Sequence, residues 1–436
     1  MRTYRELLRT PEFTPLFATV SVQVAAQTAT GLALGTLVYS RTGSPLLSSL
    51  AMFGTSLAQM LGAATLLSAA DRLPPRGALT GLALLFGLGS AVQAVPGLPL
   101  WALFGVLLLL GLVSSLGGGV RYGLLNEILP KEGFLLGRSV INMSVGTMQI
   151  GGFAIGGVLV TTLSARGTLL VGAALYLVAA AAARCGLTAR PPRAAGRPSV
   201  KETWRTNALL WSSVPRRYVY LALWVPNGLV VGCESLYLSY DPRHAGLLFA
   251  CGALGMLAGD TVLGRFVPQR WRDRLGNPLR LLLAAPYLVF ALHPSLPVAV
   301  VAVVLATTGF SASLLLQERL MALTPDELSG HALGLHTSGM LTMQGVGAAL
   351  AGGVAQLTSP ATGIVALAAL SLAVTLALAP GLRPERGPGG DSEGSGGRSA
   401  RPKSLPGQAV ARPEEVPPMP GAAFVPAAAF PLPASS

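Results

Sequence analysis

The sequence is poor in charged residues. Only 11% of its 436 residues are Asp, Glu, Lys or Arg, against 51% hydrophobic residues, and the mean hydropathy is +0.58. A soluble domain of ordinary composition carries roughly 25% charged residues. These values exclude a soluble globular protein of this length and indicate a chain that crosses a membrane several times.

Cysteine, histidine and lysine are also scarce. The three cysteines lie in or beside apolar runs, without paired spacing and without histidines at metal-ligand distance, so we interpret them as buried apolar residues and expect neither a metal nor a cofactor. They are Cys185, Cys233 and Cys251. The lysines, none of which follows a glycine-rich phosphate loop, are Lys131, Lys201 and Lys403. An ATP-driven pump is therefore disfavoured, and no Ser-His-Asp set supports an enzyme.

What the sequence has instead is long hydrophobic runs. A helix needs about 20 residues to cross the roughly 30 Å hydrocarbon core of a bilayer, and twelve runs of suitable length fit between charges or turn residues. In the first half they cover residues 13–39, 45–69, 77–95, 99–125, 134–162 and 168–187. In the second half they cover residues 218–240, 245–266, 278–292, 296–316, 332–357 and 361–382.

The net charge of +13 is distributed unevenly over the loops. Arg41, Arg166 and Arg243 fall in one set of alternate loops, and nearly all other basic residues lie on the opposite side. By the positive-inside rule this pattern predicts a multi-pass protein of the cell (inner or plasma) membrane with both termini in the cytoplasm. The positive charge thus reflects topology, and we expect no nucleic-acid partner.

An internal repeat divides the spans into two sets. Thr147–Gln149 recurs 195 residues later as Thr342–Gln344, and Met60–Leu67 matches Met256–Leu263 at an offset of 196. Chance matching in Ala/Gly-rich sequence is the alternative. We interpret the repeat as two parallel six-helix halves, residues 1–189 and 218–382.

Two segments lie outside the halves. Residues 190–217 are basic, and a capping box at Ser199–Glu202 with Trp204 and Trp211 on one stripe predicts an amphipathic helix on the cytoplasmic leaflet. The alternative is a solvated linker. Residues 383–436 are rich in Pro, Gly and Ser, a composition typical of a disordered tail, which we expect to be cytoplasmic.

Twelve spans, a long basic central loop and a six-plus-six repeat resemble the major facilitator superfamily over about residues 10–382, in particular its drug-efflux members. Asp71, Arg72 and Arg76 keep part of the family's Gly-x-x-x-Asp-Arg-x-Gly-Arg-Arg loop between helices 2 and 3, and Asp260 and Arg265 stand at the matching place in the second half. The resemblance implies gating roles for these residues. We further expect Asp260 to have a conformational role, by pairing with Arg265 or capping a neighbouring helix; contact with substrate is the alternative.

Gly152-Phe-Ala-Ile-Gly156-Gly157 is similar to the Gly-Pro-x-x-Gly-Gly segment of exporters in the family, without its proline. The resemblance implies an all-α membrane fold of twelve transmembrane helices in two pseudo-symmetric halves. It also implies a monomeric secondary active transporter that exports small amphipathic or lipophilic molecules by alternating access, with protons as coupling ion. An importer of a metabolite such as a sugar and a transport-inactive sensor or scaffold are alternatives. The glycines alone can simply let two helices approach closely.

Ionisable residues inside a span are the first candidates for function. Glu234 lies well inside the span 218–240, on the same helical face as Asn227. A carboxyl in a poorly hydrated cavity can bind and release a proton as access alternates, so Glu234 is the candidate for proton coupling. A structural salt bridge, for example to Arg121, is the alternative.

In members of the superfamily helices 1, 4, 7 and 10 line a central cavity, which implies cavity roles for polar and aromatic residues on the corresponding spans. The candidates are Gln23, Gln27, Thr30, Arg121, Trp224, Asn227, Thr307 and Ser311. The same groups can instead hold helices together. We expect the repeated pair Gln149 and Gln344 to bond equivalent groups between the halves.

Overall fold

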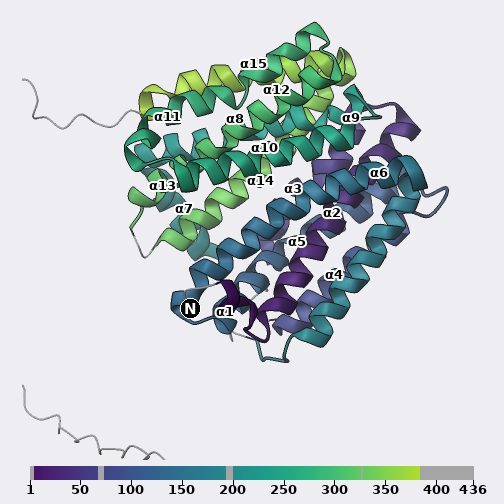
Figure 1. Cartoon of the computed structure of the whole chain (residues 1–436), viewed down its shortest axis with the longest axis vertical. Coiled ribbons are helices and arrows are strands. Elements are labelled where there is room, and N and C mark those ends of the chain that lie inside the picture. Colours follow the sequence, from purple (N-terminus) through teal and green to yellow (C-terminus); the bar gives the residue numbers. More distant parts are fainter. Residues whose placement is uncertain (1–3, 67–72, 193–199, 326–327, 383–436) are drawn as a thin grey trace, which may run out of the picture. The chain divides into compact units, whose positions relative to one another are not determined.

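A computed structural model of the chain describes residues 4–66, 73–192, 200–325 and 328–382, and over those ranges it contains helices and turns but no strand (Figure 1). The helices of the first half are α1 (Tyr4–Leu8), α2 (Phe13–Thr42), α3 (Pro45–Leu66), α4 (Pro75–Gln93), α5 (Leu100–Ile128) and α6 (Lys131–Gly186). A linker helix follows, α7 (Val200–Ser212). The helices of the second half are α8 (Val214–Ser235), α9 (Tyr237–Tyr240), α10 (Ala245–Phe266), α11 (Gln269–Leu282), η2 (Ala285–Leu292), α12 (Leu296–Thr308), η3 (Gly309–Ser311), α13 (Ala312–Ala322), α14 (Ser329–Leu357), α15 (Pro360–Leu378) and η5 (Pro380–Leu382).

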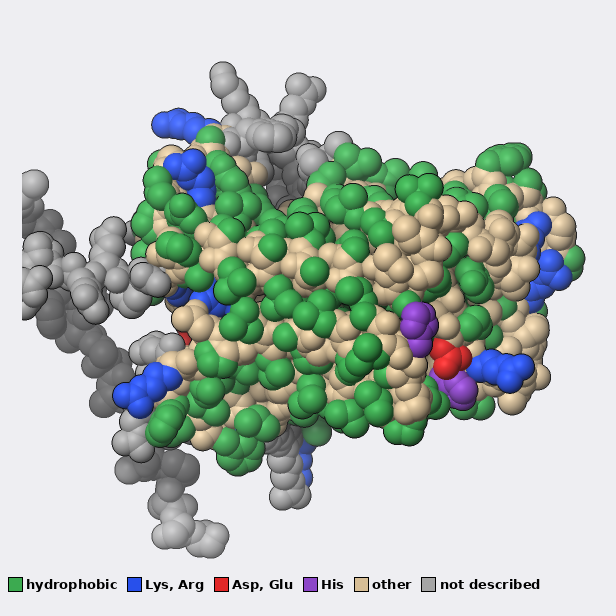
Figure 2. All heavy atoms as spheres, turned by 90° about the horizontal axis from the view of Figure 1, so that it is seen from above, with side chains coloured by type: hydrophobic (Ala, Val, Ile, Leu, Met, Phe, Trp, Pro, Cys, Tyr) green, Lys and Arg blue, Asp and Glu red, His purple; other side chains and the backbone are tan. Residues whose placement is uncertain are grey.

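The predicted all-helical membrane architecture is confirmed. Within the described ranges, nine helices are long and apolar enough to cross a membrane, and one of them, α6, contains both of the spans predicted at residues 134–162 and 168–187. The chain reverses inside α6 at Ser164, whose backbone has φ 77° and ψ 165°. Figure 2 shows hydrophobic side chains spread over the long face of the molecule, with charged side chains near its ends, as a bilayer-crossing surface requires.

Two predicted boundaries are wrong in the second half. The span at 278–292 begins nine residues earlier, because the charged turns of α11 are helical and Pro278 lies inside the helix. The span at 296–316 continues to Ala322, beyond the charged pair Glu318 and Arg319. In both cases the charges mark where the apolar stretch ends, whereas the helix continues past it.

The sequence repeat is matched by a repeat of packing. The chain order pairs α3 with α10 and the first part of α6 with α14, and the structure packs α14 on α3 and α10 on α6. Glycines 195 residues apart occupy equivalent contacts. Gly152 of α6 faces Thr28 of α2 with no room for a side chain, and Gly347 of α14 faces Gly228 of α8 in the same way. The glycines of the exporter-like segment therefore act as close-approach positions.

The halves are joined at one end of the bundle. We call this the Gly43 end; it carries the loops at residues 43–44, 94–99, 241–244, 293–295 and 358–359. There the Ser49 hydroxyl donates to the Ser235 carbonyl at 3.2 Å, and the Ser44 hydroxyl donates to the Gln356 amide oxygen at 2.7 Å. The opposite end, with residues 129–130, 267–268 and 323–325, is called the Pro130 end.

The linker helix α7 packs on the second half. Trp211 stacks on Trp224 of α8 with ring centroids 5.5 Å apart, and on Tyr220 at 6.0 Å. A helix is therefore present where the amphipathic pattern predicted one, and its Trp211 packs against the protein. The side chain of Trp204, the other tryptophan of the stripe, lies outside the described side chains.

Candidate functional site

A cavity of about 380 Å³ lies between the two halves. The first half contributes Phe53 from α3 and Gln149 and Phe153 from α6. The second half contributes most of the wall, namely Val231, Glu234, Tyr237, Phe249, Gly252, Ala253, Met256, Asp260, Phe310, Ser313, Leu314, Gln317, Met340 and Gln344. The cavity runs from the joined Gly43 end, near Tyr237, toward the Pro130 end, near Gln317.

Two carboxyl groups, from Glu234 of α8 and Asp260 of α10, line this cavity. Neither makes an ion pair or hydrogen bond with any residue that the structure describes, and the described lining contains no Lys, Arg or His. The predicted pairing of Asp260 with Arg265 is wrong, because Arg265 is an exposed residue near the end of α10. The arrangement is an uncompensated acidic pair in a mostly apolar chamber.

Both members of two repeat-related pairs line the same cavity: Phe53 with Phe249, and Gln149 with Gln344. The expectation that the glutamines bond equivalent groups between the halves is wrong, since neither amide bonds to a described residue. Each amide is instead available to a molecule in the cavity. The repeat itself was the sequence signal that singled these two positions out, but it did not show which way their side chains point.

Aromatic rings close the cavity near the Gly43 end. Phe153 of the first half stacks on Phe249 of the second with centroids 4.8 Å apart and planes at 18°, and Tyr237 meets Phe249 edge-on at 5.0 Å. The Tyr237 hydroxyl is paired with the fully buried Tyr287 hydroxyl at 2.5 Å. The wall beside Glu234 is therefore both aromatic and fixed in position.

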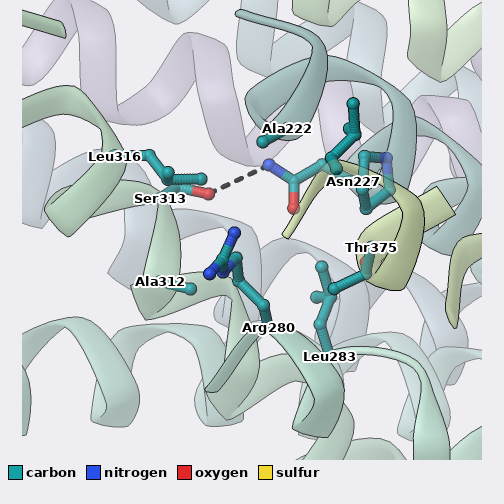
Figure 3. A pocket seen from close by; sticks show the side chains of 10 residues that line it. Ala222, Asn227, Arg280, Leu283, Ala312, Ser313, Leu316 and Thr375 are labelled. Carbon is teal, nitrogen blue, oxygen red and sulfur yellow. Dashed lines mark hydrogen bonds between the residues drawn. The ribbon is translucent and has the colours of Figure 1, made fainter. Parts of the chain in front are cut away.

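Asn227 lies behind the cavity wall. It is only 3% exposed, and its side-chain nitrogen donates to the Leu223 carbonyl at 2.6 Å and to the Ser313 hydroxyl at 2.9 Å. Ser313 lines both the large cavity and a second pocket of about 10 Å³, toward which Arg280 points (Figure 3). Such a pocket holds about one water molecule. Asn227 thus positions Ser313. The prediction that Asn227 itself lines the large cavity is wrong.

Three more predicted cavity residues lie in helix contacts. Thr307 and Ser311 are 0% and 1% exposed, and their hydroxyls donate to Val303 and Thr308 carbonyls of their own segment at 2.9 and 2.8 Å. Trp224 belongs to the aromatic contact with α7 described above. None of the three lines the cavity in this conformation.

The candidates on α2 and α5 also lie away from the lining. Thr30 donates to the Ala26 carbonyl at 2.8 Å, Gln23 is half-buried and Gln27 is exposed. Arg121 lies over the Tyr122 ring, 4.8 Å from its centroid. The alternative ion pair between Arg121 and Glu234 is therefore not formed.

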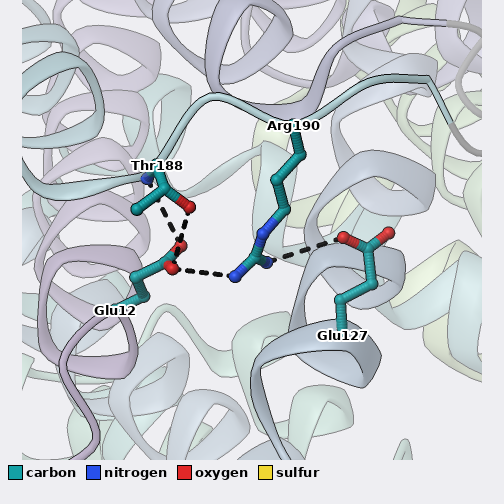
Figure 4. A network of polar contacts seen from close by, with 4 residues as sticks. All are labelled: Glu12, Glu127, Thr188 and Arg190. Atoms are coloured by element: carbon teal, nitrogen blue, oxygen red, sulfur yellow. Dashed lines mark hydrogen bonds and ion pairs between the residues drawn. The ribbon is translucent and has the colours of Figure 1, made fainter.

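The first-half gating candidates are only partly described. Asp71 and Arg72 lie outside the described residues, and Arg76 is half-buried in the first turn of α4. Sequence reasoning missed a nearby charge network: Arg190 donates to Glu12 at 2.7 Å and lies 3.5 Å from Glu127 (Figure 4). This network ties the chain after α6 to the ends of α2 and α5. Its members are far apart in the sequence, and no motif links them.

Comparison with known proteins places this geometry in a family. The family model of the Major Facilitator Superfamily matches residues 16–317. A comparison with curated proteins gives no match. Among solved structures, the nucleoside transporter NupG aligns with a TM-score of 0.65 at 14% identity, covering 85% of this chain and 100% of NupG.

Two further structures are similar over most of their length. A bacterial homolog of the human lysosomal transporter Spinster, in an inward-facing and unoccupied conformation, has a TM-score of 0.66 at 12% identity and coverages of 88% and 97%. A POT family transporter in complex with 5-aminolevulinic acid has a TM-score of 0.66 at 13% identity and coverages of 84% and 95%. At such identities the likeness shows the fold. Together with the family match, it shows that this chain is a multi-pass membrane transporter, not an enzyme, and that it belongs to the Major Facilitator Superfamily.

Proposed function

We propose that the protein is a secondary active transporter that works by alternating access and exports small amphipathic or lipophilic molecules in exchange for protons. The observation that carries the proposal is the unpaired Glu234 carboxyl in a cavity between the two halves. A cavity in that place changes its access when the halves move against each other. The bonds at the Gly43 end are those that must break when access changes sides.

Glu234 is proposed as the proton-coupling residue. A carboxylate without a cationic partner is costly to enclose away from water, whereas the protonated acid is much less so. When no substrate is bound, the cavity therefore closes more easily after the Glu234 carboxylate has bound a proton. This difference makes proton binding a condition for the conformational change.

The lining supports a small amphipathic substrate. Small-molecule sites commonly measure about 300–1,000 Å³ and combine apolar walls with a few polar groups, and this cavity of about 380 Å³ fits that description. The rings of Phe53, Phe153 and Phe249 offer apolar contact. The amides of Gln149 and Gln344 offer hydrogen bonds from both halves.

Direction and gating complete the proposal. The exporter-like sequence at Gly152–Gly157 supports export. The basic loops predict that the Pro130 end and both termini lie in the cytoplasm. Residues Asp71, Arg72 and Arg76, with Arg265 at the corresponding place in the second half, are proposed to act in gating at the Pro130 end.

The test uses everted vesicles that contain the full-length protein. For a proton antiporter, an acidic vesicle interior drives uptake of a fluorescent amphipathic substrate, and an acidic exterior does not. In everted vesicles this uptake corresponds to export from the cell. Glu234→Gln should abolish this response to the pH gradient while retaining substrate–substrate exchange, which needs no proton. Asp241→Asn, a matched change outside the cavity, should behave as wild type.

Three results would contradict parts of the proposal. A pH-driven response that survives in Glu234→Gln rejects the coupling role of this residue. Uptake driven by an acidic exterior, in place of an acidic interior, indicates proton symport and therefore an importer. Binding without movement under either gradient indicates a sensor or scaffold.

A further inference from the structure

The charge of the cavity wall points to one class of substrate. We infer that the cavity is selective for organic cations with aromatic or apolar substituents, which are held by the carboxylates of Glu234 and Asp260 and by the surrounding rings. This inference rests on the proposed transport function, and it goes further by fixing the sign of the substrate charge.

The first argument is the absence of a countercharge. Glu234 and Asp260 reach the cavity from α8 and α10, and the other lining residues within the described chain are uncharged. The nearest titratable neighbour along the wall, Tyr237, is bonded to Tyr287 and carries no positive charge. Arg280 lies in the separate small pocket behind Ser313. No basic side chain of the described lining is placed to neutralise the two acids.

The second argument is the contribution of both halves. Phe153 and Gln149 come from α6, and Phe53 comes from α3, so the first half presents neutral rings and an amide to the acids of the second half. A cation is attracted to the face of an aromatic ring, and the attraction grows when water is excluded. The stacked pair Phe153 and Phe249 places such rings in the wall that Glu234 also lines.

The third argument is discrimination against other classes. An anion entering this cavity meets two carboxylates and no donor cation, which is repulsive. A neutral molecule of the same shape fills the apolar volume but gives neither acid a partner, so it can be enclosed at low cost only after the acids have bound protons. Selectivity is a difference in binding free energy, and unpaired buried charges are an effective way to produce it. Only a cation satisfies the acids and the rings together.

The experiment compares two probes of nearly equal size, methyltriphenylphosphonium, which is a permanent cation, and triphenylphosphine oxide, which is neutral. Equilibrium dialysis measures the binding of each to the purified full-length protein in nanodiscs of zwitterionic lipid. The wild type should bind the cation at least tenfold more tightly than the neutral probe. The double variant Glu234→Gln, Asp260→Asn should lose this preference by binding the cation more weakly, and it should bind the neutral probe at least as tightly as wild type.

Two controls separate charge from misfolding. Asp260→Glu keeps the charge and should retain most of the preference, and Asp241→Asn removes an acid outside the cavity and should leave the preference unchanged. Thermal melting checks that each variant is folded.

The inference is overturned if the cation fails to bind, if the neutral probe binds the wild type as tightly, or if the double variant keeps the preference. The proposed function fails separately. Cation-selective binding without gradient-driven movement rejects transport and leaves the inference standing, while proton-driven movement of neutral or anionic molecules with no cation preference does the reverse.

Discussion

The contact between Gly157 of α6 and Gly246 of α10 gives the sharpest test of how the halves separate. A Cβ atom added at Gly246 would lie 2.6 Å from the Cα atom of Gly157 and 3.1 Å from the carbonyl oxygen of Phe153. Carbon atoms pack at about 3.5–4.0 Å, so α10 must move away from α6 by about 1 Å to accept alanine. The obstructing atoms belong to a backbone and cannot rotate aside.

Gly246→Ala raises the free energy only of the conformation in which the two halves are in contact at the Gly43 end, which we call the joined state. Overpacking of this kind costs about 1–3 kcal/mol, and the cost disappears once the halves have separated at the Gly43 end. Since about 1.4 kcal/mol corresponds to a tenfold change in an equilibrium constant, the population ratio should shift roughly 5- to 150-fold toward the separated state.

The measurement is a distance between spin labels across the Gly43 end. Val95 in the first half and Leu357 in the second are 50% and 87% exposed, so cysteines can be introduced and labelled at both sites. The background carries Cys185→Ser and Cys251→Ser, since the remaining native cysteine is fully buried. Double electron–electron resonance in nanodiscs should show a larger long-distance population in the alanine variant than in its parent.

The matched control is Gly264→Ala in the same helix. A Cβ at Gly264 meets nothing within 4 Å, so this variant gains the same helix propensity without the obstruction. The reasoning is refuted if Gly246→Ala leaves the distance distribution unchanged, or if Gly264→Ala shifts it equally.

Two further predictions concern polar groups. Gln149→Leu and Gln344→Leu each keep the cavity nearly filled but remove one amide, so each should weaken substrate binding roughly 2- to 13-fold, the equivalent of about 0.5–1.5 kcal/mol for one hydrogen bond; unchanged affinity in both would show that neither amide is used. Arg190→Gln removes the ion pair with Glu12, while Glu12 keeps its hydrogen bonds from Thr188, and should lower the free energy of unfolding by about 1 kcal/mol, seen as a lower melting temperature. Arg243→Gln, at an exposed site, should not change the melting temperature, and an equal loss in both variants would contradict the role of the ion pair.

The sequence predicted the helical spans from the length of the apolar runs, and it predicted the two-half arrangement from the repeat at 195–196 residues. Unpaired backbone N–H and C=O groups are costly in the bilayer, so long apolar runs form helices there. The repeat then shows which helix of the first half corresponds to which helix of the second. Glu234 was found as a candidate for a similar reason: a lone acid in an apolar run is conspicuous whatever the helix packs against. The structure adds that Glu234 lines the cavity, while its role stays a prediction.

The uncharged polar candidates could not be placed from the sequence. A threonine in a membrane helix satisfies its hydroxyl on its own backbone, as Thr30 and Thr307 do, and it then needs no partner in a cavity. The sequence pattern around a glutamine in a span is the same whether its side chain faces a neighbouring helix or a cavity. The difference depends on the rotation of each helix about its axis, which only the packing of both halves determines.

The seating of α7 on α8 sets a limit on how far the molecule can open. Arg190 is anchored to the first half through Glu12, and Trp211 is anchored to the second half. Only residues 191–199 separate the first anchor from the start of α7. Ten residue steps join Arg190 to Val200, and at about 3.3–3.6 Å per residue they can span at most about 36 Å. The length of this segment therefore sets an upper limit on the distance between the two anchors when the Pro130 end opens.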